Sequence, residues 1–225
     1  MKKTILACAA VALMTACTSA PDAEKNIEET TTTEAMEKNL FIVDPQNGFM
    51  DTGSLPVAGS QARMDSLASY LNALPLDYYD QILVSLDWHT VNHSSFAEYG
   101  GPWPEHCIAF TTGALVTEPL MTELLRWMKE DKVKFILKGQ LKEKDEYSSL
   151  DNEENAAFIK KALANTKTLD VCGVVGTVCV QNTIKGLIEK EAIAPSKINV
   201  LYQYTAQFDD KAEAEFVAWC KENVK

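Results

Sequence analysis

The sequence has few basic residues. Its 21 lysines and arginines stand against 32 aspartates and glutamates, which gives a formal net charge of −11, and no basic patch stands out along the chain. Proteins that bind DNA or RNA neutralise phosphates with lysine and arginine side chains, and a strongly acidic protein repels polyanions in general. We therefore expect no nucleic-acid partner.

The apolar run near the start of the chain is also short. It covers residues 5–14, fewer than an ordinary transmembrane helix needs. Lys2 and Lys3 precede this run and Met14-Thr-Ala-Cys17 follows it, an arrangement typical of a secretory signal. The last four residues are similar to a bacterial lipoprotein cleavage box, in which Cys17 becomes the acylated first residue. A plain secretory signal that is cleaved elsewhere is the alternative.

From this pattern we expect a signal over residues 1–17 and a lipoprotein that is exported to the periplasm or the cell surface. Its only contact with a membrane would be the lipid on Cys17. Residues 18–38 hold six acids, two lysines and almost nothing apolar. Such a segment cannot bury enough surface to become ordered, so we expect a disordered acidic tether. The remaining residues, 39–225, are enough for one sizeable α/β domain.

Within residues 39–225, short β-rich runs alternate with helical patterns. The expected strands cover residues 40–43, 82–86, 133–137, 169–175 and 198–204. The expected helices cover residues 61–74, 118–129, 153–164, 180–191 and 211–223. This alternation predicts a single three-layer α/β domain, in which a mostly parallel, Rossmann-like sheet is flanked by helices. Ligands of such folds bind beyond the carboxyl ends of the strands.

Histidine is scarce, and all three histidines lie in one short segment. They are His89, His93 and His106. Asp87 forms an Asp-x-His pair with the first, and the period-two alternation of a strand points both side chains to the same side. With His106 they could form a set of one carboxylate and two imidazoles, which suits Zn, Fe or Mn and leaves coordination positions open. The alternative is that these histidines have no ligand role.

The ends of other expected strands carry further reactive side chains. Asp44 ends the first strand, Lys138 ends the third, and Cys179 follows the fourth at the start of a helix. A cysteine at a helix N-terminus near a lysine should have a depressed pKa. Asp44 could take the thiol proton and later give it to a leaving amine. The loop before Cys179 could hold an oxyanion with its N–H groups, so the set predicts acyl transfer through a thioester.

Each of these residues has a plainer interpretation when it is taken alone. Asp44 could cap a turn, Lys138 could be solvated, and Cys179 could be a small buried apolar residue. The four cysteines beyond the signal are expected to be unpaired, because their spacing indicates no pairing. They are Cys107, Cys172, Cys179 and Cys220.

Several segments, taken in order, resemble the nicotinamidase/pyrazinamidase branch of the isochorismatase-like cysteine hydrolases. The resemblance covers most of residues 40–184. The matching segments are Phe41-Ile-Val-Asp-Pro-Gln-Asn-Gly-Phe49, Asp87-Trp-His89 with His93-Ser-Ser-Phe96, Trp103-Pro-Glu-His-Cys107, Lys138-Gly139 followed by Glu146-Tyr-Ser-Ser149, and Gly173 to Val180.

The resemblance implies an isochorismatase-like fold and a role for each matching residue. Asp44, Lys138 and Cys179 would be the catalytic triad. The N–H groups of Val175 and Cys179 would form the oxyanion hole, next to a cis peptide bond between Val174 and Val175. The implied reaction is the conversion of nicotinamide to nicotinate and ammonia.

The same resemblance implies the binding residues. Asp87, His89 and His106 would ligate the metal, with His93 either a further ligand or held through water. The substrate would be a small aromatic amide, and its pyridine ring would lie between two aromatic side chains. The implied substrate-binding residues are Gln46, Phe49, Trp103 and Tyr147.

Some positions depart from the family pattern. Gly48 stands where an Asp is usual, Gly176-Thr177-Val178 replaces Thr-Asp-x, Phe110 stands where a Gly is common, and the usual Asp-Ala is missing from Tyr202-Gln-Tyr-Thr-Ala. These changes leave the implied triad and metal ligands in place, and they affect which substrate the protein would accept. Two alternatives stay open: a related hydrolase of a carbamoyl, ureido or other amide, and a non-catalytic lipoprotein that binds a metal or an aromatic ligand. The sequence also leaves open whether the chain forms a homo-oligomer.

Overall fold

The computed structural model describes residues 38–224. The expected signal, the expected tether up to residue 37 and Cys17, which we expect to be acylated, lie outside the described residues. Among the residues described, no helix is both long enough and apolar enough to cross a membrane.

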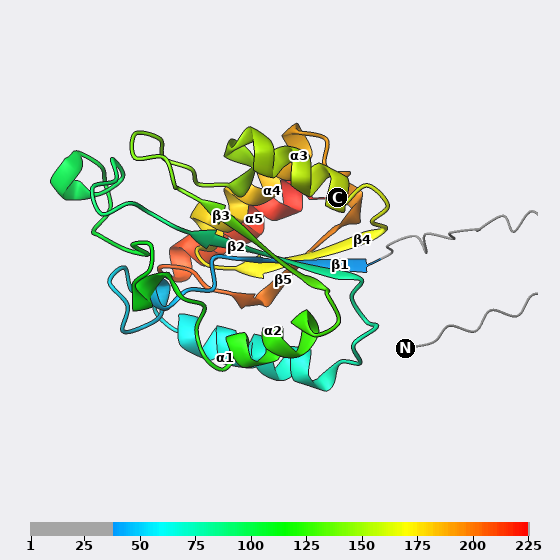
Figure 1. Cartoon of the computed structure of the whole chain (residues 1–225). Helices are drawn as coiled ribbons and strands as arrows, with labels where there is room; N and C mark the ends of the chain where they lie inside the picture. Colours follow the sequence, from blue (N-terminus) through cyan, green and yellow to red (C-terminus); the bar gives the residue numbers. More distant parts are fainter. Residues whose placement is uncertain (1–37, 225) are drawn as a thin grey trace, which may run out of the picture. The chain divides into compact units, whose positions relative to one another are not determined.

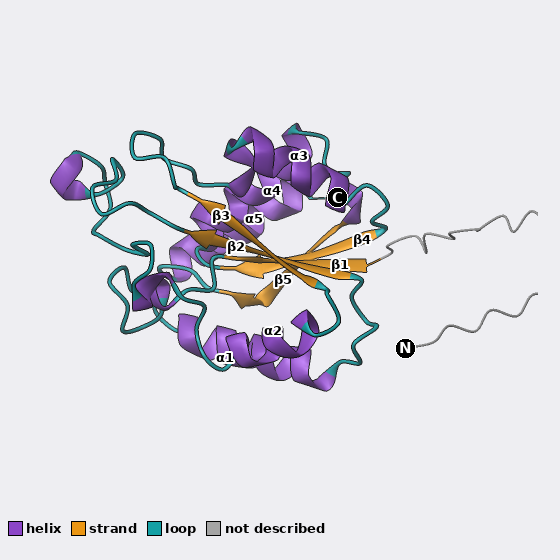
Figure 2. Ribbon diagram, viewed as in Figure 1, coloured by secondary structure: helices purple, strands orange, loops and turns teal. Residues whose placement is uncertain are grey.

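The described part of the chain forms one sheet between two layers of helices (Figures 1 and 2). The sheet has five strands in the order β3-β2-β1-β4-β5, and every neighbouring pair is parallel. This confirms the expected α/β fold class. The elements in chain order are β1 (Lys38–Val43), α1 (Ser60–Ala73), β2 (Gln81–Asp87), α2 (Leu120–Met128), β3 (Val133–Lys138), α3 (Glu153–Ala162), β4 (Thr168–Gly173), α4 (Gln181–Glu189), β5 (Ile198–Thr205) and α5 (Asp210–Asn223).

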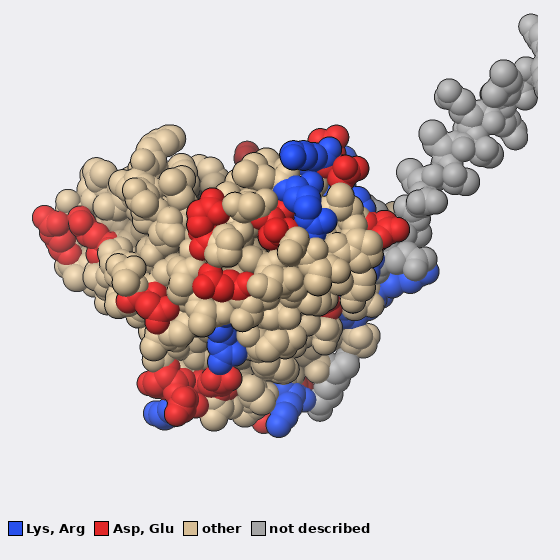
Figure 3. All heavy atoms as spheres, turned by 90° about the horizontal axis from the view of Figure 1, so that it is seen from below, with Lys and Arg blue, Asp and Glu red and all other residues tan. Residues whose placement is uncertain are grey.

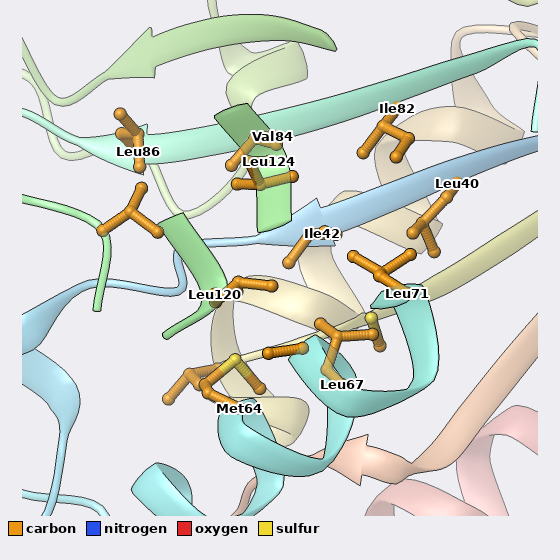
Figure 4. Close-up of a cluster of buried hydrophobic side chains, with 14 of the residues drawn as sticks. Leu40, Ile42, Met64, Leu67, Leu71, Ile82, Val84, Leu86, Leu120 and Leu124 are labelled. Atoms are coloured by element: carbon orange, nitrogen blue, oxygen red, sulfur yellow. The ribbon is translucent and has the colours of Figure 1, made fainter. Parts of the chain in front are cut away.

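Side-chain alternation along β1 explains the two layers. Leu40 and Ile42 point to the face that α1 and α2 cover, and Phe41 and Val43 point to the face under α3, α4 and α5. Both faces of a central parallel strand are buried, so the strand is apolar throughout. Figure 4 shows the first of these clusters, in which side chains of β1 and β2 meet α1 and α2. The labelled residues are Leu40, Ile42, Met64, Leu67, Leu71, Ile82, Val84, Leu86, Leu120 and Leu124.

The face of the molecule covered by α1 and α2 is seen in Figure 3. Acidic and basic side chains are interspersed on this face, and its basic side chains form no continuous stripe.

The fourth strand is shorter than the sequence predicts. It ends at Gly173 rather than at residue 175, because the chain leaves the sheet there. The peptide bond between Val174 and Val175 is cis, as the resemblance implies. The predicted helix from residue 180 also begins differently: Gly176–Val180 is a π-helical turn that contains Cys179, and α4 follows it at Gln181.

Candidate active site

The carboxyl ends of four neighbouring strands meet at one edge of the sheet. Asp44 follows β1, Asp87 ends β2, Lys138 ends β3, and Cys179 lies in the turn after β4. Because these strands are parallel and adjacent, residues far apart in the sequence are brought together there. Asp87, Lys138 and Cys179 line a cavity at this edge, and Asp44 contacts Lys138. The residues that line the cavity are Phe49, Leu55, Asp87, His89, Trp103, His106, Lys138, Asp145, Glu146, Tyr147, Val175, Val178, Cys179 and Phe208.

Lys138 lies at the centre of the charged groups. Its ammonium is 3.0 Å from Asp44 Oδ2 and 3.7 Å from Cys179 Sγ. It also contacts Asp87 Oδ1 and donates to the backbone carbonyl of Glu146 at 3.2 Å. All three of the side chains that it contacts are buried. The lysine therefore links the acid, the thiol and the proposed metal ligand in one network.

Asp44 is held by more than the lysine. Ser85, on the neighbouring strand β2, donates its hydroxyl to Asp44 Oδ1 at 2.7 Å. The backbone of Asp44 has a φ of 49°, in the left-handed region that non-glycine residues seldom adopt. Such strained positions cluster at functional sites. Ser85 could not be predicted as a site residue, because a serine inside an apolar strand has no pattern that marks it.

Burial dominates the protonation of the acid and the thiol. Burial raises the pKa of Asp44 above its ordinary value, although the nearby Lys138 acts in the opposite direction. Burial also raises the pKa of the Cys179 thiol well above its usual range; the charge of Lys138 opposes this effect, and the charges of Asp44 and Asp87 add to it. The predicted depressed pKa of Cys179 is therefore wrong for this structure. The thiol keeps its proton until a base nearby removes it.

Asp87 behaves differently from Asp44. Burial opposes its ionisation, but the charge of Lys138, together with the polar contacts to the His106 and His89 rings, outweighs burial and holds the pKa of Asp87 well below its usual value. Asp87 is thus an ionised carboxylate, the form that a metal ligand requires. The pKa of Lys138 is raised well above its ordinary value, because its attraction to Asp44 and Asp87 exceeds the cost of burial.

Asp87, His89 and His106 form a group that could hold a metal ion. Asp87 Oδ2 lies 3.5 Å from His89 Nε2 and 3.6 Å from His106 Nε2. The other ring nitrogen of each histidine is bound to backbone: His89 Nδ1 lies 3.2 Å from the Gly139 carbonyl, and His106 Nδ1 lies 2.8 Å from the Pro104 carbonyl. With Nδ1–H donating in this way, each Nε2 lone pair faces the carboxylate, as metal-binding histidines require.

The donor set fits a divalent metal. Two imidazole nitrogens and one carboxylate suit Zn, Fe or Mn, and three protein ligands leave further positions open. Gly139 allows the His89 ring to lie close to its backbone. A Cβ at this position would lie 2.5 Å from the His89 ring, and the backbone φ of 68° also favours glycine.

His93 lies outside this group. Its ring is buried and lies 4.3 Å from the His89 ring, centroid to centroid. However, Nδ1 accepts the Ser95 N–H at 3.1 Å, and Nε2 lies 3.1 Å from the Lys144 carbonyl. Burial lowers the pKa of His93, so the ring is neutral. With both ring nitrogens bound to protein, His93 supports His89 through packing and is not placed as a ligand.

Aromatic side chains line the cavity, and one of them, Phe208, has no signal in the sequence. Phe49 lies 5.4 Å from the His106 ring, and Trp103 is stacked on Phe208 with the centroids 6.2 Å apart and the planes 20° apart. Trp103 Nε1 donates to the Tyr147 hydroxyl at 3.2 Å. Phe208 follows β5, where no recognised motif lies, so only the folded chain shows that it reaches the cavity.

The resemblance implies that Gln46 contacts the substrate, but the structure places its side chain elsewhere. Its side chain is fully buried and does not line the cavity. Its Nε2 donates to the Asp87 carbonyl at 2.7 Å and to the Ala114 carbonyl at 2.9 Å, and its Oε1 accepts the Asp87 N–H at 2.7 Å. Gln46 therefore fixes the backbone of Asp87 and has no free group for a ligand.

The four cysteines of the described chain are free thiols, as the sequence predicts. Cys179 is the one that lines the cavity. Its turn keeps one donor unused: among residues 38–224, the N–H of Val175 has no hydrogen-bond acceptor. That is the condition an oxyanion-hole donor must meet before substrate binds.

Comparisons with known proteins agree with this geometry. No protein-family model matches the chain. The nicotinamidase of Saccharomyces cerevisiae is 26% identical over 215 residues, which cover 84% of this chain and 95% of the yeast protein. The nicotinamidase/pyrazinamidase of Mycobacterium tuberculosis is 37% identical over 78 residues, covering 33% of this chain and 41% of that protein.

Solved structures are similar over most of the described chain. The pyrazinamidase of Pyrococcus horikoshii in complex with zinc has a TM-score of 0.68 and 26% identity, covering 84% of this chain and 96% of its own. The PnC1 protein of L. infantum in complex with nicotinate has a TM-score of 0.69 and 27% identity, covering 84% of this chain and 90% of its own. Because the likeness extends over the whole sheet and both helix layers, the chain has the fold of the isochorismatase-like hydrolases, and its sequence is similar to those of nicotinamidases and pyrazinamidases.

Proposed function

We propose that the protein is a metal-dependent amidohydrolase that converts nicotinamide to nicotinate and ammonia through a thioester on Cys179. One observation carries the proposal. A buried acid, lysine and thiol meet at the same cavity edge as a carboxylate and two histidines with metal-ligand geometry. Two of the similar proteins are a nicotinamidase and a protein in complex with nicotinate, which favours this substrate.

In the first half of the reaction, Cys179 Sγ attacks the carbonyl carbon of the amide. The thiol proton passes to Asp44, whose raised pKa makes it a stronger base than an ordinary carboxylate. The carbonyl oxygen becomes an oxyanion that accepts hydrogen bonds from the N–H groups of Val175 and Cys179. Asp44 then gives its proton to the amino group, which leaves as ammonia, and the acyl group remains as a thioester.

The second half of the reaction reverses these roles with water. Asp44 takes a proton from water as the oxygen attacks the thioester carbon, and the carbon–sulfur bond breaks. The carboxylic acid leaves, and Cys179 regains a proton from Asp44. Lys138 contacts both the acid and the thiol, so its positive charge stabilises whichever of them is ionised at each step.

The residues around the cavity explain the selection of an aromatic amide. Phe49 and Trp103 present flat rings, and a flat substrate buries apolar area there with few rotatable bonds to restrict. When bound by Asp87, His89 and His106, a divalent metal would supply a Lewis acid that a pyridine nitrogen can bind. By holding the metal, Asp87, His89 and His106 would determine which edge of the ring faces Cys179.

The proposal is tested by ammonia release from nicotinamide and from benzamide, which keeps the ring and the amide but lacks the ring nitrogen. The purified domain should hydrolyse nicotinamide much faster than benzamide. Equal rates would contradict the role of the ring nitrogen. Hydrolysis of a carbamoyl or ureido compound, with none of nicotinamide, would replace this proposal with a related hydrolase activity.

We further propose that the protein is exported and carries a lipid on Cys17. The support is the sequence alone: a basic start, a short apolar run, Met14-Thr-Ala-Cys17 and an acidic segment behind it. These residues lie outside the described part of the structure.

A further inference from the structure

The segment that follows β5 is joined to the turn that carries the nucleophile. Ala206 donates its N–H to the Gly173 carbonyl at 3.0 Å and accepts the Gly176 N–H at 2.9 Å. The next residue, Gln207, extends this pairing with its side chain, because Oε1 accepts the Thr177 N–H at 3.0 Å. Three successive hydrogen bonds thus hold residues 173–177 against this segment, and one of them depends on a side chain.

Gly176 makes room for the Gln207 amide. A Cβ at position 176 would lie 1.5 Å from Gln207 Nε2 and 2.4 Å from its Cδ. The amide therefore occupies the space where a side chain of residue 176 would begin.

Gln207 is buried, with 6% of its surface exposed, and its Nε2 has no acceptor among the described residues. A buried amide with an unused donor is uncommon and calls for a physical reason. The reason for burying this amide lies in its oxygen. Gln207 Oε1 accepts the Thr177 N–H, which would otherwise be unpaired at the start of the turn. The following residue, Phe208, lines the cavity, so this short segment contacts both the turn and the substrate space.

We infer that Gln207 is a positioning residue that fixes the Gly176–Val180 turn, and with it the N–H groups of Val175 and Cys179. The inference rests on the proposed function, since those two groups are its oxyanion donors. Gln207 does not line the cavity. Its loss should therefore misalign donors that act in the transition state and leave substrate binding nearly unchanged.

The test replaces Gln207 by methionine, which keeps the volume and removes the acceptor. The matched control is Gln203→Met, an exposed glutamine on β5. For nicotinamide hydrolysis, Q207M should lower kcat by about 10- to 100-fold and change KM by less than about threefold. Q203M should match the wild type. A kcat of Q207M within about twofold of Q203M, or a loss that appears in KM alone, would overturn the inference.

Gly176→Ala supplies an independent test. The new Cβ displaces the Gln207 amide, so this variant should lose kcat as Q207M does. In the double variant Gly176→Ala with Gln207→Ala, the loss should not exceed that of the worse of the two single variants Gly176→Ala and Gln207→Ala, because both changes remove one interaction. If the two losses multiply, the residues act separately and the inference fails.

Amide hydrogen exchange separates this inference from the proposed function. In Q207M, a peptide that contains residues 174–180 should exchange faster than in the wild type, and in Q203M it should not. If the wild type releases no ammonia from nicotinamide, the proposed function fails while the exchange result still decides the role of Gln207. Unchanged exchange in Q207M would overturn that role.

Discussion

Replacing Lys138 by methionine should destabilise the protein strongly. The side chain of Lys138 is 1% exposed, and its ammonium contacts the buried carboxylates of Asp44 and Asp87. Methionine keeps much of the length and removes the charge, so both carboxylates stay buried without their cation. Breaking a buried ion pair from one side costs about 3–5 kcal/mol. We expect the free energy of unfolding at pH 7 to fall by about that amount.

The pH dependence of this loss has a definite sign. Without the lysine, the pKa of Asp44, which burial already raises, should rise further, and the pKa of Asp87 should rise above that of the unfolded chain, about 3.9. A carboxyl group with a raised folded pKa destabilises the protein while it is ionised, and the penalty disappears as the pH falls through that pKa. The lysine itself stays charged across this range, because its raised pKa matters only in alkaline solution. The loss should therefore shrink between pH 7 and pH 5.

Urea unfolding measures this loss directly. The wild type, Lys138→Met and the matched control Lys134→Met on the same strand should be compared at both pH values after treatment with a chelator. Chelation removes the contribution of bound metal to stability. A loss below about 1 kcal/mol at pH 7, the range of an exposed ion pair, would refute the reasoning. So would a loss that grows on acidification.

Other predictions address the metal, the cavity and export. His89→Ala and His106→Ala should each lose the bound divalent ion in metal analysis, whereas His93→Ala should keep it, because the structure binds both His93 ring nitrogens to protein; equal retention by all three would contradict the ligand assignment. Phe208→Ala should raise KM for nicotinamide about two- to tenfold with a smaller change in kcat, since an aromatic contact contributes about 0.5–1.5 kcal/mol, and an unchanged KM would remove Phe208 from the binding site. Cys17→Ala should abolish lipid labelling and release the protein into the soluble fraction, and membrane retention of the variant would argue against the anchor.

Much of the fold could be predicted from the sequence because local patterns match the global arrangement. The buried strand β1 is apolar at successive positions, as a strand covered on both faces must be. The Asp87-x-His89 spacing correctly places two side chains on one side of the chain, and the fold then brings His106 to them. These features depend on residues close together in the sequence, where periodicity is informative.

Features that depend on distant segments could not be predicted. Phe208 and Gln207 reach the site from beyond β5, and nothing in their local sequence marks them. The high pKa of Cys179 was also missed, because local sequence indicates a nearby lysine and a helix start but not complete burial beside two carboxylates. Gln46 matches a motif, yet only the hydrogen bonds show that it holds Asp87 rather than a ligand.

The central claim is that Cys179 becomes acylated during turnover, and mass measurement of acid-quenched enzyme tests this most directly. Enzyme that is mixed with excess nicotinamide and quenched during turnover should carry one nicotinoyl group, on the peptide that contains Cys179. Cys179→Ala should carry none and release no ammonia, while its unfolding transition stays close to that of the wild type. Ammonia release by Cys179→Ala at the wild-type rate would contradict the account.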